Sequence, residues 1–271
     1  MNGPRSIPQI SVFPHQLPPG QAASIGTPFT AARLIRTLLH IIFPTACAGC
    51  REPLWDDPVP FFCRQCWDTL KPIPGPVCPR CGRPFASSIA LQHSPTHQCG
   101  ACRKRPLALT QAWSLFSYQT PLKEAITLFK YRGKLSLTTP LARAMIEALP
   151  DLPDLDGIIP VPLHPQRLRE REYNQSLLLA DRLSRQTGIP LVLACLVRIR
   201  PTVPQTSLSK KERLTNLRGA FSVAKPAHIQ GKRILLVDDV FTTGTTLHEC
   251  AKALRRAGCG PVFGLTLARM V

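Results

Sequence analysis

Residues 234–246 read ILLVDDVFTTGTT, and this stretch decides the fold. Its first four residues are large and apolar, as in a strand that is buried on both faces. Two acids end the apolar run. A loop of threonines and glycine then leads into an amphipathic pattern over 246–257, which predicts a helix. A strand that passes through a short loop into a helix is typical of α/β domains with parallel sheets.

The loop between this strand and helix has the chemistry of a phosphate site. The N-terminus of a helix presents free N–H groups and a partial positive charge, and both favour a phosphate monoester. Gly244 would let the backbone approach the anion closely, and the neighbouring hydroxyls add donors. The residues assigned to this phosphate site are Thr242, Thr243, Gly244, Thr245 and Thr246.

Asp238 and Asp239, directly before the loop, predict the rest of the ligand. Their carboxylates could accept hydrogen bonds from two adjacent sugar hydroxyls, or help to hold Mg²⁺, which prefers oxygen ligands. A phosphate about one sugar away from a diol describes a ribose 5-phosphate. The motifs GxxxxGK[ST] and GxGxxG do not occur in the chain, so a P-loop and a dinucleotide site of that type are excluded.

Strands and helices alternate on both sides of this unit. Apolar runs predict strands at 112–118, 156–161, 190–197, 220–223, 233–237 and 262–267. Helical periodicity predicts helices at 121–131, 136–149, 166–187 and 246–257. This alternation predicts an α/β domain over 109–271, with a mainly parallel sheet flanked by helices.

Four C-x-x-C pairs precede the α/β domain. Each pair turns two sulfurs to one side of a tight knuckle, and two knuckles form a tetrahedral four-sulfur site that suits Zn²⁺. We therefore expect two structural zinc ions. Sequential pairing of the knuckles is the simplest arrangement, and interleaved pairing is the alternative. The eight ligands are Cys47, Cys50, Cys63, Cys66, Cys78, Cys81, Cys99 and Cys102.

Other interpretations of the cysteines are less favourable. A disulfide framework is disfavoured because the first 30 residues lack the apolar core of a secretory signal, and a redox motif needs a thioredoxin-like context. Two knuckles that share one zinc ion form a zinc ribbon, and zinc ribbons are compatible with a structural or partner-docking role and with nucleic-acid contact. The residues expected in the core are Cys195, Cys250 and Cys259, those expected in loops are His93 and His97, and those expected at positive φ are Gly49, Gly82 and Gly100.

The charge balance of the chain favours polyanions. Its 271 residues include 34 Lys and Arg against 16 Asp and Glu, a formal net charge of +18, which favours nucleic acid or phosphorylated small molecules. Basic residues over 198–218 are either solvated surface charge, or groups that neutralise a diphosphate or contact a nucleic-acid backbone.

No stretch reaches the roughly 18–20 apolar residues of a membrane helix, since Arg36 and His40 interrupt the apolar run 34–43. We expect a cytoplasmic protein with a disordered, Pro-rich tail over 1–35 and a double zinc ribbon over 36–108.

Residues 234–246 resemble the phosphoribosyl-diphosphate-binding motif of type I phosphoribosyltransferases, which joins a hydrophobic strand, two acids and a threonine- and glycine-rich loop. Together with the four knuckles, they resemble the ComF family, competence-associated phosphoribosyltransferase-like proteins with an N-terminal double zinc ribbon. The resemblance covers about 40–271. The other residues that carry it are the PVPLH segment 160–164, Asn174, Gln175, Pro204, Gln205, Thr206, Arg213, Asn216, Gly219, Ala220 and Phe221.

The resemblance implies roles position by position. Asp238 and Asp239 would be the catalytic acids that bind the ribose hydroxyls, and the threonine loop would bind the 5-phosphate. Val161 and Pro162 fall where a diphosphate-binding loop follows the first core strand, and 201–219 would form a mobile hood near the acceptor. The family usually has RGFNQ where this chain has REYNQ at 171–175, so a glutamate replaces a glycine and adds an anion near the expected anion site.

The resemblance implies an enzyme that binds phosphoribosyl diphosphate with Mg²⁺ and transfers the pentosyl group to an unidentified acceptor, in connection with DNA uptake and natural transformation. The bond from C1 to diphosphate would break through an oxocarbenium-like state, a step that depends on positioning and electrostatics rather than on a nucleophilic side chain. The alternative is a non-enzymatic adaptor that binds single-stranded DNA, or a DNA-uptake or helicase protein, through its ribbons and basic surface.

Overall fold

The computed structural model of the protein describes residues 45–201 and 217–270. The tail expected over 1–35 and most of the expected hood, 202–216, lie outside these residues. The same is true of several residues that carry the family resemblance, namely Pro204, Gln205, Thr206, Arg213 and Asn216.

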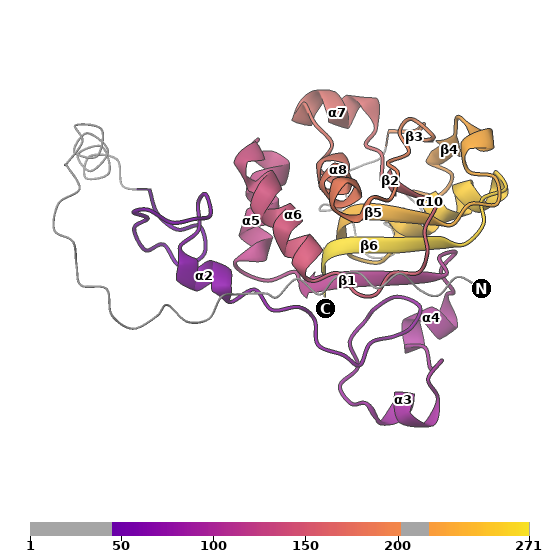
Figure 1. The fold of residues 1–271 in the computed structure, drawn as a ribbon, viewed down its shortest axis with the longest axis horizontal. Coiled ribbons are helices and arrows are strands. Elements are labelled where there is room, and N and C mark those ends of the chain that lie inside the picture. Colours follow the sequence, from indigo (N-terminus) through magenta and orange to yellow (C-terminus); the bar gives the residue numbers. More distant parts are fainter. Residues whose placement is uncertain (1–44, 202–216, 271) are drawn as a thin grey trace. The chain divides into compact units, whose positions relative to one another are not determined.

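Four parallel strands form the main sheet, in the order β1-β6-β5-β2 (Figure 1). In this register, Val237 of β5 pairs with Leu265 of β6 on one side and with Pro160 of β2 on the other. The predicted parallel α/β sheet is therefore confirmed. The strands are β1 (Gln111–Ser117), β2 (Gly157–Pro160), β5 (Ile234–Phe241) and β6 (Val262–Arg269).

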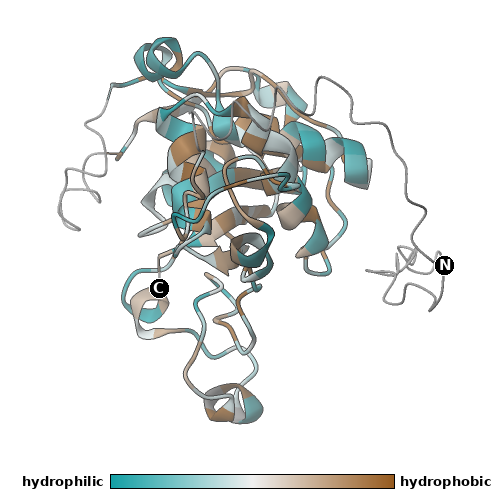
Figure 2. Cartoon of the chain, turned by 90° about the vertical axis from the view of Figure 1, so that its left-hand side faces the viewer, coloured by the Kyte–Doolittle hydropathy of each residue, from teal (hydrophilic) through white to brown (hydrophobic). Residues whose placement is uncertain are grey.

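Helices cover both faces of this sheet. Along β5, Leu235 and Val237 belong to one hydrophobic core and Ile234 and Leu236 to another, as the two-residue period of a strand requires. Figure 2 shows hydrophobic and hydrophilic residues alternating along the helices, because each helix buries one side and exposes the other. The first core contains α5 (Leu122–Tyr131), α6 (Thr138–Glu147) and α8 (Gln175–Thr187), and the second contains α10 (Thr245–Arg256). Single 3-10 turns are η1 (Leu135–Leu137) and η3 (Pro226–His228).

The helix expected over 166–187 is in fact two helices, α7 (Pro165–Arg171) and α8. Glu172 ends α7 in the left-handed conformation, with φ at +65°, which a continuous right-handed helix excludes. Asn174 then caps α8, since its Oδ1 accepts hydrogen bonds from the backbone N–H groups of Ser176 and Leu177 at 3.0 and 3.4 Å. The prediction was wrong because the apolar periodicity continues across this short break.

The prediction of a strand at 190–197 is wrong for most of these residues. Leu191 makes an isolated parallel bridge to Ile158 of β2, and Ala194, with φ at +53°, turns the chain out of the extended conformation. The next strand begins at Leu196 and belongs to a separate antiparallel pair. That pair is β3 (Leu196–Arg198) and β4 (Phe221–Val223).

Two cysteine-rich segments precede β1 and contain the short helices α2 (Arg64–Asp68), α3 (Ile89–His93) and α4 (Gly100–Lys104). Of the three knuckle glycines expected at positive φ, Gly82 alone has it, at +68°. Gly49 is instead required by space, since a Cβ there would lie 3.0 Å from the Sγ of Cys66. His93 ends α3 rather than lying in a loop, whereas His97 lies in a loop as expected.

The three cysteines outside the pairs, Cys195, Cys250 and Cys259, are buried as predicted. In residues 45–201 and 217–270, none of the helices combines the length and the apolar character needed to span a bilayer.

Candidate functional site

The acid pair lies in the second half of β5, which extends beyond the predicted 233–237 to Phe241. Asp238 accepts hydrogen bonds from the Ser176 hydroxyl of α8 and from the backbone N–H of Asp239, both at 3.0 Å. Asp239 accepts one from the ammonium of Lys130 on α5, with 2.7 Å between Nζ and Oδ1. Two helices therefore meet the carboxyl end of β5, the edge at which open α/β sheets bind ligands.

Lys130 is a site residue that sequence reasoning missed. Its side chain is 17% exposed and that of Asp239 is 10% exposed, so water screens this ion pair weakly. The neighbours of Lys130 also contact the junction of α7 and α8. The Tyr173 hydroxyl donates to the Phe129 carbonyl, and the guanidinium of Arg171 lies 4.9 Å from the centre of the Tyr131 ring. The end of α5 is thus part of the site.

The charges in this cluster depend on one another. Burial raises the pKa of Asp238 to about 7, and the adjacent Asp239 adds to this rise, while Lys130 and the hydrogen bond from Ser176 oppose it. Burial alone would lower the pKa of Lys130, but the nearby negative charge, chiefly that of Asp239 with a contribution from Asp238, raises it above its ordinary value. Lys130 therefore stays charged, and Asp238 changes its protonation near neutral pH.

The threonine loop turns sharply at Gly244, the residue that precedes α10, where φ is +75°. A Cβ on Gly244 would lie 2.5 Å from the Cζ of Phe241, so both the backbone conformation and the adjacent ring require glycine. The hydroxyls of Thr243 and Thr245 share a hydrogen bond of 2.8 Å. Thr242 follows β5 directly, and Thr246 lies in the first turn of α10.

The segment that follows β2 lies beside the acid pair. The N–H of Val161 donates to the carbonyl of Val237 at 2.9 Å, which holds Val161 next to the residue before Asp238. The Asn174 side chain donates to the Val161 carbonyl at 3.0 Å, so the residue that caps α8 also fixes this segment. Pro162 follows in the loop that leads into α7.

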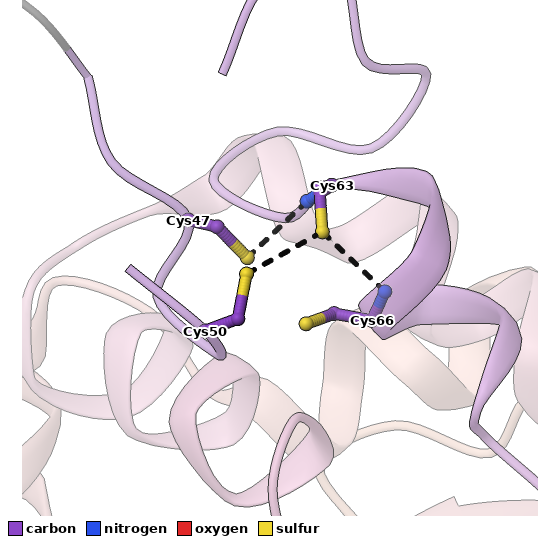
Figure 3. Close-up of side chains that lie close together, drawn as sticks. All are labelled: Cys47, Cys50, Cys63 and Cys66. Atoms are coloured by element: carbon purple, nitrogen blue, oxygen red, sulfur yellow. Dashed lines mark hydrogen bonds between the residues drawn. The ribbon is translucent and has the colours of Figure 1, made fainter. Parts of the chain in front are cut away.

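The eight paired cysteines form two four-sulfur clusters with sequential pairing. Within each cluster all four sulfurs lie within 4.8 Å of one another. The Cys50–Cys63 and Cys81–Cys99 Sγ distances are both 3.7 Å, close to the ~3.8 Å edge of a tetrahedron with Zn–S bonds of about 2.3 Å. Figure 3 shows the four sulfurs of one cluster directed toward a common centre. We name Cys47, Cys50, Cys63 and Cys66 the first tetrad, and Cys78, Cys81, Cys99 and Cys102 the second tetrad.

In each tetrad the surroundings lower the pKa of one sulfur and favour its thiolate, the form that binds metals, whereas burial and the neighbouring sulfurs raise the pKa of others, such as Cys66 and Cys102. The Cys47 sulfur accepts hydrogen bonds from the backbone N–H groups of Gly49 and Cys63, at 3.4 and 3.3 Å. Burial raises the pKa of Cys47, but backbone N–H groups more than offset this and lower it to about 6. In the second tetrad, the hydrogen bond from Cys102 lowers the pKa of Cys81 to about 5. The donor sets of both tetrads fit structural zinc.

Two protein-family models match the chain. Residues 38–105 match the double zinc ribbon domain, and residues 174–266 match the phosphoribosyl transferase domain. The fold and the site thus define a phosphoribosyltransferase-type α/β domain preceded by a double zinc ribbon. Lys130 and the strands β1 and β2 lie before the second matched region, so the match alone does not include them.

Several known proteins are similar in sequence to this chain over most of its length. Competence protein F of Haemophilus influenzae is 36% identical over 217 residues, which cover 77% of this chain and 90% of that protein. Competence protein ComFC of Bacillus subtilis is 33% identical over 213 residues, which cover 76% and 83%. DNA utilization protein YhgH of Escherichia coli is 33% identical over 238 residues, which cover 83% and 97%. The chain belongs to the ComF family.

Proposed function

We propose that the chain binds phosphoribosyl diphosphate together with Mg²⁺ and transfers the phosphoribosyl group to an acceptor. The observation that carries this proposal is the acid pair in the second half of β5, the strand that leads through the Gly244 turn into the N-terminus of α10. A ribose 5-phosphate has a diol and a phosphate at its two ends, and carboxylates and helix N-termini complement these groups. The matched phosphoribosyl transferase domain over 174–266 supports the same ligand.

Each part of the site has a role in this proposal. The carboxylates of Asp238 and Asp239 accept hydrogen bonds from the ribose hydroxyls, and residues 242–246 donate to the 5-phosphate. Val161 and Pro162 lie on the side of the diphosphate. Asp238 and Asp239 also offer the oxygen ligands that Mg²⁺ prefers, and this ion would neutralise charge on the departing diphosphate.

In the proposed reaction, the bond between C1 of the ribose and the diphosphate oxygen breaks, and its electron pair leaves with the diphosphate. A nucleophilic atom of the acceptor then bonds to C1. Positive charge develops on the ribose ring during this step, and the nearby carboxylates stabilise it. The chain contributes position and electrostatics rather than a covalent intermediate.

We further propose a role in DNA uptake and natural transformation, and a cytoplasmic location. The similar proteins of Haemophilus influenzae and Bacillus subtilis are named competence proteins, and that of Escherichia coli a DNA utilization protein. None of the eleven cysteines, all of which lie in the described residues, forms a disulfide, as is usual in a reducing compartment. In this proposal, 36–108 forms the ribbon domain and 109–271 the catalytic domain.

Calorimetric titration with phosphoribosyl diphosphate and MgCl₂ tests the binding step. Asp239→Asn should weaken binding about tenfold or more, because a hydrogen bond to a charged group contributes about 1.5–3 kcal/mol. The matched control is Asp181→Asn, which removes a carboxylate from α8 that pairs with Arg185, and it should bind like the parent. A parent protein that does not bind the ligand would overturn the proposal.

Release of diphosphate, measured with a panel of acceptor bases and other nucleophiles, tests the transfer step. Release that depends on one acceptor supports the enzyme. Binding without release in the presence of any acceptor would favour the adaptor. In that case the ribose-phosphate site serves as a sensor, and the ribbons and basic surface bind single-stranded DNA or a DNA-handling protein.

A further inference from the structure

Arg269, the last residue of β6, is a buried cation that lies outside the acid pair and the threonine loop. It is 1% exposed, and its Nη1 donates a hydrogen bond of 2.6 Å to the carbonyl of Cys81. Among the described residues, the salt bridges do not include Arg269, and its Nε has no hydrogen-bond partner. A cation buried in this way costs free energy unless negative charge lies nearby.

The second tetrad supplies that negative charge when it holds a metal ion. Four thiolates around one Zn²⁺ carry a net charge of about −2. All four cysteines of the second tetrad are buried, with exposed fractions between 1% and 6%, so water screens this charge weakly. Because Arg269 bonds to Cys81 directly, β6 places a permanent cation beside the metal site.

On its other side, Arg269 contacts the residue that lies against the phosphate loop. Its guanidinium is 4.8 Å from the centre of the Phe241 ring, a cation–π distance, and the two residues also pair across β5 and β6. The Phe241 ring lies so close to Gly244 that a Cβ there would be 2.5 Å from the ring. A continuous set of contacts therefore runs from Cys81 to the loop.

The first tetrad has different neighbours. Cys47 belongs to the hydrophobic core that also contains Leu122 and Phe129 of α5, and Cys50 is exposed. A Cβ on Gly49, between these two cysteines, would lie 3.5 Å from Pro121, which precedes α5. Within the described part of the chain, these contacts lead to α5, so the two tetrads differ in what they support.

We propose that Arg269 is a positioning residue that couples the second tetrad to the phosphate loop, so that a zinc ion in this tetrad and a phosphate bound at residues 242–246 stabilise each other. The coupling rests on the proposed function, since it needs a phosphate ligand at this loop. Metal binding fixes the Cys81 carbonyl and supplies the counter-charge for Arg269. Arg269 then holds the Phe241 ring against Gly244, in the position that shapes the loop. By thermodynamic reciprocity, a ligand on the loop must strengthen zinc binding by the same factor.

The test measures how fast each tetrad loses zinc in the full-length, zinc-loaded protein. A zinc-selective chelator is added together with N-ethylmaleimide, and mass spectrometry follows the alkylation of each cysteine with and without phosphoribosyl diphosphate and MgCl₂. We expect the ligand to slow alkylation of the second tetrad at least about fivefold, a typical allosteric factor. The first tetrad contacts α5 rather than the phosphate loop, so the ligand should protect it much less, and it serves as the comparison within the same molecule.

Variants of the connecting residues separate coupling from general stabilisation. Arg269→Met keeps most of the side-chain volume and removes the charge, so the ligand should no longer protect the second tetrad, and ligand affinity should also fall. Phe241→Leu, which removes the ring, is a second variant that should show the same loss even if Arg269→Met does not fold. The matched control is Arg143→Met, because Arg143 is exposed and pairs with Glu147 on α6.

Calorimetry on the same samples distinguishes the two ways in which the idea can fail. Equal protection of both tetrads, or none, in a protein that binds the ligand would overturn the coupling and leave the proposed function intact. A protein that does not bind phosphoribosyl diphosphate would overturn both.

Discussion

At the scale of the residue, the ammonium group of Lys130 favours the ionised form of the acid pair. Lys130 faces Asp239 directly and lowers the pKa of Asp238, against burial and the neighbouring carboxylate, which raise it to about 7. Arg198 of β3 and Cys250 of α10 also interact with the charge of Asp238. A ligand that donates hydroxyl groups or shares Mg²⁺ needs both carboxylates ionised. Its affinity should therefore increase as the pH rises through about 7.

Lys130→Met tests this dependence. Without the cation, the pKa of Asp238 should rise further, by about one unit or more, so the increase in ligand affinity should move to higher pH by a similar amount. Calorimetric titrations of phosphoribosyl diphosphate with Mg²⁺ between pH 6 and 9 measure this shift. Lys123→Met, an exposed lysine on the same helix, is the control for titration of the ligand itself. Identical pH profiles for the two variants would exclude the role given to Lys130.

Residues differ in how far their place could be predicted. The site role of Asp238 and Asp239 could be predicted because a buried strand, two acids and a threonine loop are adjacent in sequence. The contact of Lys130 with Asp239 could not be predicted in this way, since the two residues meet only after α5 packs against the sheet. The sequence around Lys130 has the pattern of an ordinary helix. Glu172 is missed for another reason, because a left-handed conformation is signalled in a sequence by glycine and seldom by glutamate.

At the scale of the element, the strand–loop–helix unit depends on one tight turn. Gly244 and Gly188 have nearly the same backbone conformation, with φ at +75° and +73°. They differ in their surroundings, since a Cβ on Gly188 would meet nothing within 4 Å, whereas one on Gly244 would meet the Phe241 ring. The two glycines therefore separate the effect of conformation from the effect of packing.

Gly188→Ala should cost about 1–2 kcal/mol of the free energy of unfolding, from the left-handed conformation alone. Gly244→Ala should cost about 1–3 kcal/mol more, because the ring must move, and it should weaken ligand binding at least about tenfold. Urea denaturation and calorimetry on both variants check this. Equal losses of stability, with unchanged ligand affinity in both, would show that the Phe241 ring does not shape the loop.

The junction of α7 and α8 contains a correctable strain. Glu172 holds φ at +65°, a conformation that costs a residue with a side chain about 1–2 kcal/mol relative to glycine. Glu172→Gly should therefore raise the melting temperature by about 2–4 °C for each kcal/mol relieved. Glu170→Gly, two residues earlier in helical conformation, should lower it, since glycine disfavours a helix by about 1 kcal/mol. A melting temperature that falls in both variants would mean that Glu172 makes contacts that outweigh the strain.

At the scale of the whole molecule, the two tetrads are separate metal sites, and zinc content should report each one alone. We expect about two zinc ions per chain in freshly purified, reduced protein. Cys50→Ser, which removes an exposed ligand of the first tetrad, should lower this to about one. Cys259→Ser, outside both tetrads, should leave it at about two. Elemental analysis measures these contents, and a parent protein without zinc would refute the assignment of both tetrads.

The order of the strands has a consequence for synthesis on the ribosome. β6 lies between β1 and β5 in the sheet, yet it is translated after both. Roughly 150 residues separate β1 from β6 in the chain, so at about 5–20 residues per second the sheet waits on the order of 10–30 s for its bridging strand. Until then, β1 has no partner in the sheet, and the segment that carries the acid pair has an open edge. Unpaired strand edges of this kind make a newborn chain prone to aggregate, and the sheet that carries the candidate site is complete only when β6 has been made.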